Sequence, residues 1–159
     1  MKVTIGTYPK SPKRERKVSV HIDRSDVWNM DHTLALIVVP MLKMLKEDKH
    51  GSPYVDNDDV PDHLHDTQTG FSYDTDENHH ARWVWVLDEM IWAFEQHASS
   101  EWELQYYSGE TDLKIDDTGL MYEGPDHTFK VDYDGMTAHR ARMKNGLRLF
   151  AKYYDGLWT

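Results

Sequence analysis

The longest helical pattern in the chain covers residues 77–97 and includes the segment "WVWVLDEMIW" at 83–92. At 100° per residue, one wide apolar face collects His80, Trp83, Val84, Leu87, Met90, Ile91 and Phe94. The opposite stripe collects Trp85, Asp88, Glu89, Trp92 and Gln96. This helix is therefore apolar on two sides, and any fold has to account for both.

The second stripe has two readings, which the sequence leaves open. Two indole rings two turns apart, with two carboxylates between them, are typical of a site for a cation, a base or a basic peptide. This reading makes Trp85, Asp88, Glu89 and Trp92 candidate binding residues. Alternatively, a second layer of the same chain covers the stripe. Each tryptophan buries ~150–250 Å², so exposing both forfeits several kcal/mol at ~25 cal/mol/Å², which favours burial.

The remaining patterns predict an α+β fold in a single domain covering residues 1–159. Alternation predicts strands at 2–8 and 17–23, joined by a basic hairpin loop. A second helix is predicted at residues 31–47. Because residues 34–39 are apolar all round, we expect this helix to be central. Three or four strands should follow residue 101, and a helix at 136–156 contains Gly146, which permits close approach of a neighbour. The N-terminal hairpin and this C-terminal meander would form an antiparallel sheet packed with about three helices.

Charge is distributed unevenly along the chain. The net charge is -10, but residues 1–24 carry seven Lys/Arg against two acids, and residues 136–159 carry five against one. The middle of the chain, 25–135, has a balance of -19, and it includes a long acidic loop at about 48–78 without periodicity. An acidic body disfavours nucleic acid as a partner and favours a basic protein surface or a cation.

A ladder of basic residues follows the last predicted helix. Arg140, Lys144, Arg148 and Lys152 are spaced four residues apart and so share one slowly turning face, whereas Arg142 lies off it. The ladder could hold phosphate groups, which makes Arg140, Lys144 and Arg148 candidate binding residues. The alternative, which the acidic middle of the chain favours, is a solvated or internally paired face.

Metal and catalytic templates are weak. Glu77 and His80 have the i, i+3 spacing of di-iron bundles, but no second Glu-x-x-His occurs. Asp31, His32, His63 and His65 match no standard site, so we assign no metal ligand and leave cofactors unknown. The chain has no cysteine, no glycine-rich phosphate loop, no G-x-S-x-G and no HExxH. Catalytic residues are therefore unknown, and whether the protein is an enzyme stays uncertain.

Three blocks carry a resemblance: "MDHTLALIVVPMLKMLKEDKHGSPYVDNDDVP", "HHARWVWVLDEMIWAFEQ" and "NGLRLFAKYYDGLW". They resemble a family of small uncharacterised proteins encoded by tailed bacteriophages. The likeness covers most of residues 25–157 and implies a viral protein acting in the host cytoplasm. The family has no assigned activity that could be carried over to residues of this chain.

Three functions are compatible with these observations. The first is a phage accessory protein that binds a host protein or small ligand through an acidic, Trp-rich surface. The second is a metal-dependent hydrolase of a nucleotide or phosphate substrate, and the third is a virion structural component. We expect no membrane insertion, because the most apolar stretch, 33–45, is too short to span a bilayer. A homo-oligomer is possible.

Overall fold

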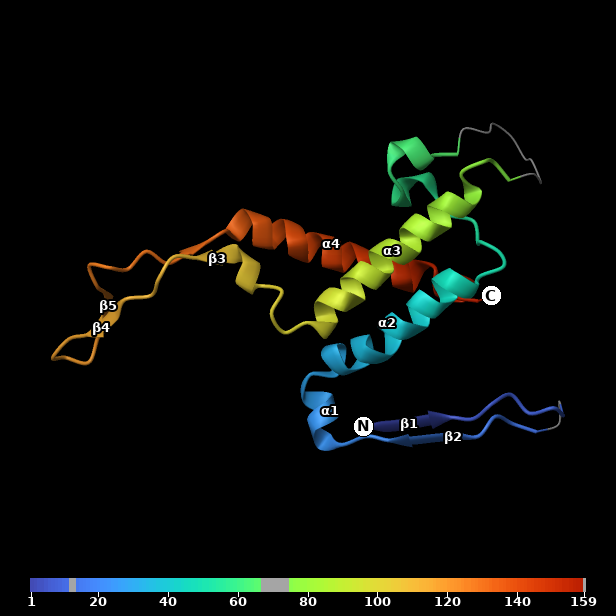
Figure 1. Ribbon diagram of the computed structural model, residues 1–159, viewed down its shortest axis with the longest axis horizontal. Helices are drawn as coiled ribbons and strands as arrows, with labels where there is room; N and C mark the ends of the chain where they lie inside the picture. Colours follow the sequence, from blue (N-terminus) through green and yellow to red (C-terminus); the bar gives the residue numbers. More distant parts are fainter. Residues whose placement is uncertain (12–13, 67–74, 159) are drawn as a thin grey trace.

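The computed structural model describes residues 1–11, 14–66 and 75–158. Three long helices form its centre: α2 (Met30–Asp48), α3 (His79–Ala98) and α4 (Tyr133–Lys152). Helix α3 packs against α2 on one side and α4 on the other (Figure 1). Two hairpins project from this centre in different directions, so the molecule is extended.

Helix α3 supplies most of the core. Trp83, Val86, Leu87, Met90 and Ala93 are all fully buried. Ala35 and Leu42 of α2 and Leu149 of α4 belong to the same core cluster as these α3 side chains. The apolar face predicted for residues 77–97 is therefore confirmed in outline, although the buried histidine is His79 and His80 is exposed.

Gly146 permits the close approach of α4 to α3, as the sequence suggested. A Cβ placed on Gly146 would lie 2.3 Å from Ala93 Cβ and 2.6 Å from the Glu89 carbonyl oxygen. Only a residue without a side chain allows the two backbones to come this close.

The expectation that residues 31–47 form the central helix is wrong. Helix α2 lies at the edge of the helical layer, and Leu34, Leu36, Met41 and Met44 are each 46–65% exposed. Residues 34–39 are apolar all round, but α3 covers only one side of them. The central position belongs to α3, because α3 has apolar side chains on two faces over its whole length and so can contact a helix on each side.

The strands confirm the α+β class but do not join into one sheet. Strands β1 (Lys2–Ile5) and β2 (Val18–His21) form the N-terminal antiparallel hairpin. In the C-terminal arm, β3 (Tyr107–Ser108) pairs with β6 (Lys130–Val131), and β4 (Leu113–Ile115) pairs with β5 (Met121–Glu123). Each sheet among the described residues thus has two strands.

Short helical turns connect these elements. Helix α1 (Arg24–Trp28) joins the N-terminal hairpin to α2, η3 (Leu104–Tyr106) precedes the C-terminal arm, and η4 (Tyr154–Gly156) follows α4. The acidic loop predicted at 48–78 contains η1 (Asn57–Asp59) and η2 (Asp62–Leu64), and its residues 67–74 lie outside the described part. Val55 and Val60 of this loop are buried in the helical core, which its lack of periodicity concealed.

Candidate functional site

Part of the second stripe of α3, Glu89 and Trp92, faces α4 and binds a cation that comes from the chain itself. The Arg142 guanidinium lies over the Trp92 ring, 3.9 Å from its centroid. It also donates two hydrogen bonds to the buried Glu89 carboxylate, of 3.0 Å from Nε and 2.7 Å from Nη2. These hydrogen bonds raise the pKa of Arg142. The combination of an indole and a carboxylate does recognise a cation here, but the cation is internal.

The other half of the stripe is also occupied. Asp88 accepts a 2.5 Å hydrogen bond from Lys46 of α2, and both side chains are substantially exposed. Trp85 is partly buried and packs against the helical core. Neither predicted tryptophan of this stripe is therefore an exposed ring, and Trp85, Asp88, Glu89 and Trp92 do not converge on one open site.

The basic ladder of α4 is paired in the same way. Arg140 bonds Glu103 at 2.7 Å, and Arg148 and Lys152 both bond Asp59. Lys144 has no ion-pair partner among residues 1–11, 14–66 and 75–158. Three of the four ladder cations are thus occupied by carboxylates of this chain, which leaves little positive surface for phosphate.

Asp59 is the hub that holds the acidic loop on α4, and the sequence did not single it out. Its side chain is 2% exposed and accepts hydrogen bonds from Arg148, Lys152 and the Tyr153 hydroxyl. Burial alone would raise the pKa of Asp59, but these three donors together hold it below its usual value. Burial and the bond to Asp59 raise the pKa of Tyr153 to about 12. The only sequence signal was an acid next to the apolar Val60 in an otherwise polar tract.

A cluster of aromatic rings lies where the N-terminal part of α4 meets the C-terminal part of α3. His139 stacks on Trp102, with ring centroids 4.6 Å apart, and lies 4.8 Å from the Trp92 centroid. Its Nδ1 is 2.9 Å from the Tyr106 hydroxyl, while its Nε2 is buried without a hydrogen-bond partner. Burial, followed by the charge of Arg142, lowers the pKa of His139. The arrangement keeps this imidazole neutral.

The candidate metal ligands are dispersed. His32 Nδ1 lies 3.2 Å from the His97 carbonyl oxygen at the C-terminal end of α3, whereas His80 Nδ1 bonds Ser52 near the N-terminal end of that helix. Along α3 the two positions are separated by roughly 25 Å at 1.5 Å per residue. Within the described parts of the chain, no three His, Asp or Glu side chains are grouped so that they could hold a metal ion.

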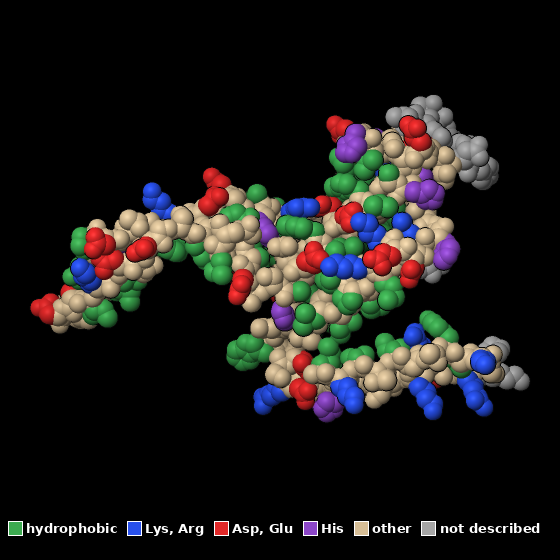
Figure 2. All heavy atoms as spheres, viewed as in Figure 1, with side chains coloured by type: hydrophobic (Ala, Val, Ile, Leu, Met, Phe, Trp, Pro, Cys, Tyr) green, Lys and Arg blue, Asp and Glu red, His purple; other side chains and the backbone are tan. Residues whose placement is uncertain are grey.

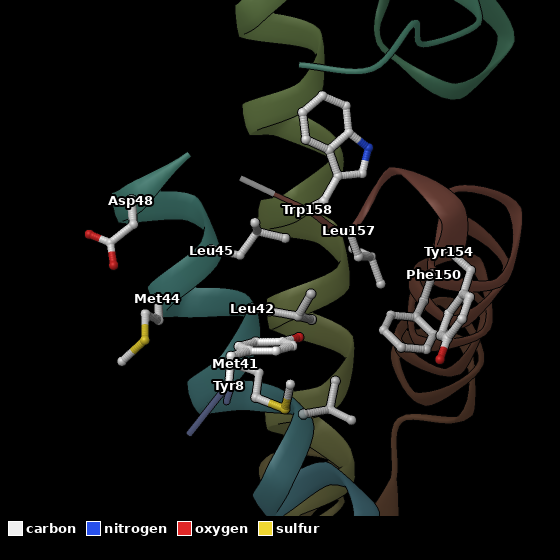
Figure 3. A pocket seen from close by; sticks show the side chains of 11 residues that line it. Tyr8, Met41, Leu42, Met44, Leu45, Asp48, Phe150, Tyr154, Leu157 and Trp158 are labelled. Carbon is white, nitrogen blue, oxygen red and sulfur yellow. The ribbon is translucent and has the colours of Figure 1, made fainter. Parts of the chain in front are cut away.

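A further surface that remains available is apolar. Figure 2 shows hydrophobic side chains along the edge of the N-terminal hairpin that faces the helices, and Lys and Arg along its opposite edge. Beside it, a groove of about 760 Å³ lies between α2 and the C-terminal segment, over α3 (Figure 3). Met41 and Met44 of α2, Phe150 and Trp158 line it, and Tyr8 from the hairpin arm closes one side.

Comparison of the chain with protein-family models, with curated proteins and with solved structures finds no significant match. No helix within the described residues has both the length and the apolar character needed to cross a membrane.

Proposed function

We propose that the protein acts by binding another protein, through the apolar surface shared by the β1–β2 hairpin and α2. This is the binding function expected from the sequence, moved from the Trp-rich stripe of α3 to a different surface. The supporting observation is that α2, whose residues 34–39 are apolar on all sides, has one side uncovered. Contiguous exposed apolar surface of this kind typically marks an interaction site.

The residues that line the groove beside α2 indicate the kind of ligand. The groove beside α2 is open, and Asp48 is the only charged residue among those that line it. A small polar ligand would find few hydrogen-bonding partners there, whereas a protein surface could cover the methionines. The proposed ligand is therefore a protein, and with the phage resemblance we propose that it is met within an infected bacterium.

Assembly into a virion stays a second proposal. The two projecting hairpins expose Ile5 and Val18 at one end of the molecule and Ile115 and Met121 at the other. Arms of this kind suit contacts between subunits of a larger particle. Mass spectrometry of purified particles, compared with lysate of infected cells, distinguishes a virion component from an accessory protein.

Co-purification from expressing cells tests the binding function. Met41→Lys places a charge on the proposed surface, and Ile115→Lys makes the same change at an equally exposed position on the remote arm (65% and 68% exposed). A stoichiometric protein partner, identical or different in sequence, should be retained by the wild type and by Ile115→Lys and lost by Met41→Lys. If Met41→Lys retains the same partners as the wild type, the surface is wrong. Stoichiometric zinc, iron or manganese in the purified protein would instead favour the hydrolase alternative.

A further inference from the structure

The N-terminal hairpin has one apolar face that no other described element of the chain covers. The register pairs Val3 with Val20 and Ile5 with Val18, so these four side chains point to the same side of the two-stranded sheet. They are 39–61% exposed, and Ile22 extends the face at 50%. A two-stranded hairpin is marginally stable by itself in water and needs such a face to be covered.

Helix α2 presents a second uncovered face, here named the outer stripe. Its members recur at helical spacing on the side away from α3: Met30, Leu34, Ile37, Met41 and Met44. Apart from the partly buried Ile37, these side chains are 46–65% exposed. Tyr8, which follows β1, and Met41 of the outer stripe line the same groove, so the hairpin arm borders the outer stripe there (Figure 3).

The area of the two faces matches a dimer interface. From the exposed fractions, the hairpin face and the outer stripe together leave on the order of 900 Å² of side-chain surface in water, and a standard stable interface buries about 800 Å² on each partner. A short peptide or a small ligand would cover only part of this area. A second copy offers an equal apolar area on the same elements, as a two-fold interface requires.

Charge does not oppose such an interface. Lys2 and Lys17 alternate with the apolar side chains of their strands, so they lie on the opposite face of the hairpin (Figure 2). Covering the apolar face therefore leaves these cations in water and buries no unpaired charge.

We propose that two copies of this chain associate reciprocally, with the apolar face of each hairpin covering the outer stripe of α2 in the other copy. This inference rests on the proposed binding function and names the partner for the same surface. The dimer completes the burial of α2, which the sequence predicts and a single copy does not achieve.

Sedimentation equilibrium tests the association. The wild type should have twice the 18.7 kDa mass of one chain at micromolar concentration. Met41→Lys should raise the dissociation constant at least ~10-fold, the effect of losing one central contact. Ile115→Lys, which is remote from the interface and equally exposed, should leave the dimer unchanged. A monomeric wild type, or equal dissociation constants for the two variants, overturns the proposal.

The geometry can be tested by cross-linking, because the natural chain has no cysteine. Protein carrying Val20→Cys is mixed with differently tagged protein carrying Met41→Cys and mildly oxidised. A disulfide-linked pair containing one chain of each kind is expected. Replacing Val20→Cys with Ser19→Cys, on the opposite face of the same strand, should abolish this product. Equal yields from the two positions contradict the proposed face.

Two further outcomes separate this inference from the function on which it rests. If the Val20→Cys/Met41→Cys double variant forms only an intrachain disulfide at monomer mass, the hairpin covers its own α2. The second-copy inference and the proposed surface then both fail. If the wild type is monomeric but captures a different protein that Met41→Lys does not, the binding function holds and only the second-copy inference fails.

Discussion

Arg142 bridges Trp92 and Glu89: its guanidinium lies 3.9 Å from the indole centroid and donates two hydrogen bonds to the carboxylate. Glu89 is 11% exposed and Arg142 49% exposed, so the pair lies at the edge of the α3–α4 contact. Helix α4 thus supplies the cation for which the tryptophan stripe of α3 is suited, and the site serves to join two helices.

Removing this cation should destabilise the fold. Arg142→Ala leaves Glu89 buried without its partner, and we expect the free energy of unfolding to fall by about 2–3 kcal/mol, less than for a fully buried pair. The free energy of unfolding of Arg142→Lys should lie between those of the wild type and Arg142→Ala, because an ammonium cannot form the bidentate pair with the carboxylate. Urea titration measures both variants. Lys144→Ala, an exposed change on the same helix, should alter the free energy of unfolding by no more than about 0.5 kcal/mol. If Arg142→Ala has an equally small effect, Arg142 does not stabilise the fold through Glu89.

Asp59 should couple stability to acid pH. The folded protein holds the pKa of Asp59 below its value in the unfolded chain, which is near 3.8. As pH falls below about 4, the unfolded chain therefore takes up this proton first, and the free energy of unfolding decreases. Asp59→Asn should cost about 2–3 kcal/mol at pH 7 and flatten the acid limb of a stability curve measured from pH 7 to 2. The exposed neighbour Asp58 provides the control, since Asp58→Asn should preserve both the stability and the slope.

His139 should contribute to pH dependence in a higher range. Burial and Arg142 lower its pKa below 6.5, so the unfolded chain binds the proton more readily once the pH drops below that value. Stability should therefore decrease as the pH falls from about 7 toward 5. His139→Phe keeps a ring between Trp92 and Trp102 but cannot titrate, and its unfolding free energy should change less over this range. Identical slopes for the two proteins would show that His139 does not carry the effect.

Gly146 should tolerate no side chain. Gly146→Ala gains helix propensity but brings its Cβ to 2.3 Å from Ala93 Cβ, and we expect a net loss of about 1–3 kcal/mol from overpacking. Adding Ala93→Gly removes the carbon–carbon clash and should recover part of this loss, because the two positions are in contact. Thermal unfolding of the single and double variants measures the change in stability caused by each. Strictly additive effects would mean that the helices do not meet at these two residues.

Local patterns were sufficient for the secondary structure and the fold class. The helix expected at 31–47 is observed at Met30–Asp48, and the strands expected at 2–8 and 17–23 pair as a hairpin over fewer residues. The last helix begins at Tyr133, three residues before the expected 136, because Asp132 caps it by accepting a hydrogen bond from Gly135. Periodicity and capping are properties of neighbouring residues, so they can be read from the chain directly.

The candidate site depended on contacts between distant residues. Arg142 was noted as lying off the basic ladder, and only the packing of α4 on α3 places it against Glu89, 53 positions away. Asp59 and Lys152 are 93 positions apart, and the acidic tract marked Asp59 only by its place next to the apolar Val60. Which carboxylate meets which cation is decided by how the helices approach each other, and many pairings suit the same charge pattern.

By itself, the sequence determined where helices and strands form, that α3 is apolar on two faces, and that acidic and basic segments are separated. The tertiary structure decided that α3 rather than α2 is central, that the tryptophan stripe is filled by Arg142, and that the outer stripe of α2 is left uncovered. The physical reason is that hydrophobic periodicity shows which side of a helix needs to be buried, whereas the identity of the surface that buries it depends on long-range packing.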